Sequence, residues 1–127
     1  MAMPTENPKK LLVANNFREE FVAVMKTLMA QAHDTAVDCG WYEKEINIGE
    51  HIALTHSELS EALDAMRHGN PPSKKIPEFT SAEEELADVV IHVMDFCEHH
   101  NMDLPGAILR KMQFNAERPY HHGGKLF

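Results

Sequence analysis

The chain has 127 residues, of which 43% are hydrophobic and 25% charged, so its length and composition fit one folded domain with one modest core. The formal net charge of −8 disfavours binding to nucleic-acid polymers and to anionic membranes, and an anionic small-molecule substrate would need cations, most naturally divalent metal. No apolar run approaches the roughly 18 residues of a membrane span, and two cysteines are too few for a disulfide scaffold. We therefore expect a cytoplasmic protein.

The first two predicted helices lie on either side of Gly40. Over residues 14–39, apolar side chains recur at the three- and four-residue steps of a helix, at Phe17, Phe21, Met25, Leu28, Ala32 and Val37. Asn47 and Glu50 have the spacing of a capping box, which predicts that a second helix begins there, and Gly69 predicts its end. The apolar line of this second helix comprises Ile52, Leu59, Ala62, Leu63 and Met66.

Two further helices are predicted after the proline-containing loop NPPSKKIPEF. Ser81 and Glu84 have a capping-box spacing and predict the start of the third helix. Its residues expected to face the core are Leu86, Val89, Val90, Val93 and Cys97. Pro105 suits the first turn of a fourth helix, which should end before Pro119.

No segment shows the alternating pattern of a strand, so the sequence predicts an all-α, four-helix bundle-like fold. We expect a single domain over residues 1–127, with a flexible N-terminus at 1–12 and a C-terminal tail at 119–127.

The first predicted helix carries apolar side chains on more than one face, at Phe17, Phe21, Val22, Val24, Met25, Leu28 and Met29. A helix that is apolar on several sides must be buried on several sides, and one small bundle cannot easily cover it. The sequence therefore predicts an oligomer in which this helix packs between subunits.

One acidic pattern occurs twice. Glu58-Leu-Ser-Glu61 in the second helix matches Glu85-Leu-Ala-Asp88 in the third. Residues three apart on a helix are neighbours, about 5–6 Å between Cβ atoms, so each acid pair repels unless cations or solvent intervene. A solvated surface is the usual reading of one such pair. Two pairs on neighbouring helices, with no lysine or arginine at the matching positions, instead suggest four carboxylates around a hard cation such as Mg²⁺, for which Mn²⁺ can substitute.

The two acid pairs resemble the paired acidic motif of the MazG-like, all-α nucleoside triphosphate pyrophosphohydrolases. The segments NIGEHIALTHSELSEALDAMRHGN, EELADVVIHVMDF and KMQFNAERPYHHGGKLF are similar to segments of that family, in the same order. The resemblance implies a homodimer or homotetramer that uses Mg²⁺ to convert a (deoxy)nucleoside triphosphate to the monophosphate and pyrophosphate. It also implies that Glu58, Glu61, Glu85 and Asp88 bind the metal. One of the four could instead hold the attacking water as a general base, and we expect Glu61 in that role.

Further residues are expected to bind the substrate. Lys111, Asn115 and Arg118 lie on one stripe of the fourth helix and match the family pattern Lys-x-x-x-Asn-x-x-Arg-Pro-Tyr, which favours phosphate binding. Tyr120 is expected to close over the ligand. Trp41 has two readings, since it could stack on a nucleobase or anchor the core.

Two other functional classes fit parts of this pattern. One is a catalytically degenerate relative that senses nucleotides or serves in assembly, which a turnover assay would distinguish from an enzyme. The other is a carboxylate-bridged metal bundle unrelated to nucleotides, but that class typically uses Glu-x-x-His, and the sequence contains no such motif.

Overall fold

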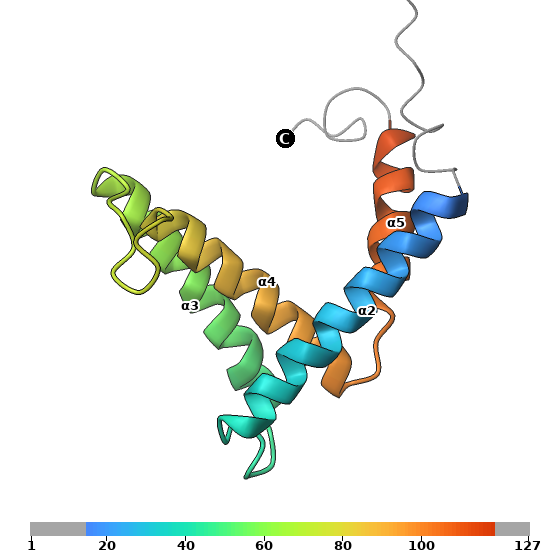
Figure 1. The fold of residues 1–127 in the computed structure, drawn as a ribbon, viewed down its shortest axis with the longest axis horizontal. Helices are drawn as coiled ribbons and strands as arrows, with labels where there is room; N and C mark the ends of the chain where they lie inside the picture. Colours follow the sequence, from blue (N-terminus) through green and yellow to red (C-terminus); the bar gives the residue numbers. More distant parts are fainter. Residues whose placement is uncertain (1–14, 119–127) are drawn as a thin grey trace, which may run out of the picture. The chain divides into compact units, whose positions relative to one another are not determined.

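The structure is a computed structural model that describes residues 15–118 (Figure 1). Over this range the chain forms four α-helices and no strand, which confirms the predicted all-α class. The helices are α2 (Asn15–Asp38), α3 (Ile48–Arg67), α4 (Ser81–His99) and α5 (Leu104–Ala116). The expectations for residues 1–12, for the tail at 119–127 and for Tyr120 lie outside the described residues. No described helix has the combined length and hydropathy needed to cross a membrane.

The chain divides into two compact units, and the boundary falls inside α2. One unit contains the described residues up to Thr27 and from Asp103 onward, and it includes α5. The other, Leu28–Met102, contains the rest of α2 together with α3 and α4. Within this second unit α3 and α4 pack side by side and run in opposite directions (Figure 1).

Asn47 is the N-cap of α3, and one of the two hydrogen bonds of the predicted capping box is described. The side-chain oxygen of Asn47 accepts a hydrogen bond from the N–H of Glu50 at 3.0 Å. After the helix, Gly69 has a φ of +80°, a left-handed conformation that favours glycine, so the chain turns there at little energetic cost.

The start of α4 differs from the prediction by one residue. Thr80, not Ser81, is the N-cap: its hydroxyl accepts the N–H of Glu83 at 3.2 Å, and the Glu83 carboxylate accepts the N–H of Thr80 at 2.7 Å. The predicted pairing of Ser81 with Glu84 is wrong because both side chains have other partners. Ser81 donates to the carbonyl of Pro72 at 3.5 Å, and Glu84 binds residues of the preceding loop.

The buried apolar side chains of the second unit are Met29, Ala62, Ala82, Met94 and Cys97. The prediction that Leu86 and Val90 face the core is wrong for the single chain, since they are 48% and 54% exposed. Val90 and Cys97 lie seven residues apart and so on the same face of α4, yet Cys97 is buried. That face is therefore covered only toward the C-terminal end of α4. The apolar line of α3 is likewise exposed except at Ala62.

Candidate functional site

Three of the four predicted metal ligands converge where α3 packs against α4. Glu58, Glu61 and Glu85 each offer a carboxylate oxygen, and these atoms all lie within 4.8 Å of one another. Glu58 and Glu85 are half-buried, whereas Glu61 is exposed. We call these three residues the acidic cluster. The fourth predicted ligand, Asp88, is not part of this group of atoms, but its charge acts on Glu58 and the two residues line one cavity.

Burial and mutual repulsion make the acidic cluster hard to ionise fully. Burial is the main reason that the pKa of Glu85 is raised to about 7, and hydrogen bonds and charge repulsion from Glu58 and Glu61 add to it. The pKa of Glu58 is also raised, first by burial and then by Glu61 and Asp88. Half-buried carboxylates that repel one another are relieved by a cation, and a donor set made only of carboxylate oxygens fits Mg²⁺ or Mn²⁺.

We predict that Glu85→Gln raises the stability of the metal-free protein at pH 8 but not at pH 4.5. The folded-state pKa of Glu85 lies above its ordinary value of 4.5. Its contribution to the free energy of unfolding is therefore fully present below pH 4.5 and is lost as the pH rises through about 7. Glutamine does not ionise, so Glu85→Gln avoids this loss. We expect the free energy of unfolding at pH 8 to increase by on the order of 1 kcal/mol, a figure that allows for solvent screening.

Urea unfolding in chelator at both pH values measures this effect. Glu45→Gln, which removes an exposed carboxylate outside the cluster, is the control and should leave the pH dependence unchanged. Equal effects of the two substitutions would contradict the prediction.

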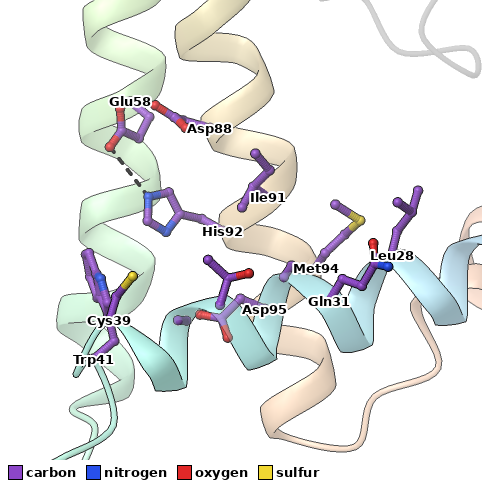
Figure 2. Close-up of a pocket in the computed structure, with 13 residues that line it drawn as sticks. Leu28, Gln31, Cys39, Trp41, Glu58, Asp88, Ile91, His92, Met94 and Asp95 are labelled. Atoms are coloured by element: carbon purple, nitrogen blue, oxygen red, sulfur yellow. Dashed lines mark ion pairs between the residues drawn. The ribbon is translucent and has the colours of Figure 1, made fainter. Parts of the chain in front are cut away.

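A cavity of about 540 Å³ adjoins the acidic cluster (Figure 2). Glu58 and Asp88 line it together with apolar side chains from α2, α4 and the turn after α2, among them Leu28, Trp41, Ile91 and Met94. Trp41 is 48% exposed, so it does not anchor the core of the single chain. Trp41 forms part of the cavity wall, and its stacking on a nucleobase stays a prediction.

His92 connects the cavity wall with the acidic cluster. Its Nε2 lies 3.5 Å from a carboxylate oxygen of Glu58, and its ring meets the ring of Trp41 edge-on with 5.8 Å between centroids (Figure 2). His92 lies one turn after Asp88 on α4, a spacing that fits either support of a metal site or ordinary polar packing. The contact with Trp41 has no local signal in the sequence.

Asp95 is a buried carboxylate that joins three segments of the second unit. It is 4% exposed and accepts hydrogen bonds from Nδ1 of His33 and from the hydroxyl of Tyr42, both at 2.9 Å. The buried Nε2 of His51 lies 3.6 Å from its other oxygen. Because Tyr42 follows Trp41 directly, Asp95 helps to fix the turn that carries the tryptophan. Its partners are distant in sequence, so no local pattern could have revealed them.

The predicted phosphate-binding stripe belongs to the other unit. Lys111 and Arg118 flank the ring of Phe114, with Nζ at 4.7 Å and Cζ at 5.4 Å from its centroid, and both cations are exposed, as is Asn115. Phosphate binding by these residues stays a prediction.

Comparisons of the chain with protein-family models, with curated proteins and with solved structures found no match. The described residues form an all-α protein with an acidic cluster at the edge of a partly apolar cavity. Any assignment of activity depends on the chemistry of that site.

Proposed function

We propose that the protein is a Mg²⁺-dependent nucleoside triphosphate pyrophosphohydrolase in which Mn²⁺ can substitute for Mg²⁺. The observation that carries the proposal is the convergence of Glu58, Glu61 and Glu85 beside a cavity with an aromatic residue in its wall. The same acids carry the sequence resemblance to the MazG-like family.

The acidic residues would hold the cation, with Asp88 completing the set. A bound divalent cation supplies positive charge that offsets the phosphate charge and acidifies water. Glu61 is exposed, so its carboxylate can accept a proton from an attacking water molecule. In the net reaction water cleaves the α–β phosphoanhydride bond, and the products are a nucleoside monophosphate, pyrophosphate and a proton.

The cavity suits the nucleoside part of the substrate. Its volume of about 540 Å³ falls within the range of small-molecule sites, roughly 300–1,000 Å³. Trp41 offers a flat ring for stacking against a base, and Gln31 and Thr35 add groups that both donate and accept hydrogen bonds.

The test is a panel of canonical and modified nucleoside triphosphates assayed with Mg²⁺, in which pyrophosphate and inorganic phosphate are measured separately. We expect pyrophosphate to form without inorganic phosphate. Binding of triphosphates without turnover would favour the degenerate nucleotide sensor, and neither binding nor turnover would reject the proposal.

We also infer that the protein is a homodimer or homotetramer. Ile52, Leu59, Leu63 and Met66 share one face of α3 and are each at least 45% exposed in the single chain. Phe17, Val24 and Leu28 on α2 are exposed as well. A second copy of the chain would cover such apolar surface, as the sequence analysis anticipated for α2.

We predict that Leu63→Lys dissociates the oligomer, because a lysine on the apolar face of α3 would be buried without a partner at a closed interface. Ala53→Lys is the control, since this exposed residue of α3 lies about 100° from Ile52 and away from the apolar face. Light scattering at micromolar protein measures the mass. A wild-type mass equal to the 14.4 kDa of one chain would contradict the proposed assembly.

A further inference from the structure

The loop between α3 and α4 brings a lysine close to the acidic cluster. Nζ of Lys75 lies 3.2 Å from Oε1 of Glu84. Glu84 directly precedes Glu85 and lies four residues before Asp88, so Glu84 and Asp88 are neighbours on the surface of α4. Consistent with this position, the negative charges of Asp88 and Glu85 raise the pKa of Lys75, after the larger effect of Glu84.

The backbone around Lys75 is held by hydrogen bonds. Ser73 is 2% exposed, and its hydroxyl donates to the carboxylate of Glu84. The same hydroxyl accepts the N–H groups of Lys75 and Ile76, both at 3.1 Å. Both carboxylate oxygens of Glu84 therefore bind the loop: Oε2 accepts from Ser73, and Oε1 pairs with Lys75. Ser73 and Glu84 are positioning residues that hold this part of the loop against α4.

The ammonium group of Lys75 remains accessible, because its side chain is 79% exposed. An ammonium has three donors, and the contact to Glu84 uses one, so donors remain for an incoming anion. Cations are scarce in the unit Leu28–Met102, which has four lysines and arginines against fifteen aspartates and glutamates. Of these four cations, Lys75 is the one with an ion pair among the interactions that the structure describes.

We infer that Lys75 contacts a phosphate group of the substrate, from a loop that Ser73 and Glu84 hold beside the acidic cluster. This inference rests on the proposed function and adds a phosphate-binding residue that the sequence analysis did not include. Lys75 would offset charge on the phosphate chain beyond what the cation offsets, as an ammonium commonly does in phosphate sites.

The inference predicts opposite effects on two ligands. In Lys75→Ala, kcat/KM for the triphosphate should fall about tenfold and inhibition by pyrophosphate with Mg²⁺ should weaken about tenfold, because a charge-assisted hydrogen bond is lost. The affinity for Mg²⁺ alone should stay equal or rise, because removing a cation near a cation site lowers repulsion. If Lys75 only kept the acidic residues in place, Mg²⁺ affinity would fall together with activity.

Lys74→Ala is the matched control, because Lys74 is the neighbouring exposed lysine of the same loop. It should stay within about twofold of wild type in all three measurements, and Lys75→Arg should recover part of the loss because it keeps the charge. Equal effects of Lys74→Ala and Lys75→Ala would overturn the inference, and so would a parallel loss of Mg²⁺ affinity. If the wild type hydrolysed no triphosphate, the proposed function would fail, while weaker pyrophosphate binding by Lys75→Ala alone would still support Lys75 as a phosphate contact.

Discussion

Glu58→Gln is expected to lower turnover by at least about 100-fold while the protein stays folded, because a proposed metal ligand would be replaced by a weaker, uncharged one. Glu58 contributes to the group of carboxylate oxygens within 4.8 Å of one another and also lines the cavity. Asp88→Asn is expected to act in the same direction. The substitution removes charge from a repulsive group, so the free energy of unfolding without metal should stay equal or increase.

The control for this prediction is Asp64→Asn. Asp64 is also an acid of α3, but its side chain is 73% exposed and its partner is His68 near the end of the helix. It should keep activity within about twofold of wild type, since exposed ion pairs contribute little. Steady-state kinetics at saturating Mg²⁺, together with urea unfolding, separates loss of function from loss of fold. Near-wild-type turnover in both Glu58→Gln and Asp88→Asn would reject the proposed metal site.

The helices could be predicted from the sequence because their signals are local. Asn47 with Glu50 and Gly69 mark the two ends of α3 through contacts within a few residues. The predicted N-cap of α4 differs by one residue from the observed one, because the sequence offers two overlapping capping boxes. One pairs Thr80 with Glu83 and the other pairs Ser81 with Glu84. The choice depends on the loop, which engages Ser81 through Pro72 and Glu84 through Ser73. Local spacing alone cannot decide between two such candidates.

The site was predictable to the extent that helix periodicity determines it. The repeated acid pairs on α3 and α4 suggested one shared space, and three of the four residues do bring their carboxylates together. Helix periodicity does not predict the contact of Lys75, because this lysine reaches Glu84 from the loop before α4. The contacts of His92 with Glu58 and Trp41 join three separate segments, so no spacing within one helix encodes them.

Asp95→Ala is expected to be strongly destabilising, by about 2–4 kcal/mol, because it removes a buried carboxylate and leaves two part-buried hydrogen-bond donors without their acceptor. Asp95 is 4% exposed and accepts from His33 and Tyr42, and His51 is buried beside it. Asp95→Asn keeps one acceptor oxygen, so its free energy of unfolding should fall by less. The measurement is urea unfolding near pH 7, where Asp38→Ala, which removes an exposed acid of α2, should have little effect.

The same substitution should loosen the turn that carries Trp41, because Tyr42 loses the hydrogen bond that ties it to α4. The chain has one tryptophan, so its fluorescence reports on this turn alone. Acrylamide should quench Trp41 more efficiently in Asp95→Ala than in wild type under conditions where both are folded, and Tyr42→Phe should produce part of this change with a smaller loss of stability. Unchanged stability in Asp95→Ala would show that the buried carboxylate does not hold these segments together. Reduced stability with unchanged quenching would show that Asp95 stabilises the unit without positioning the wall of the cavity.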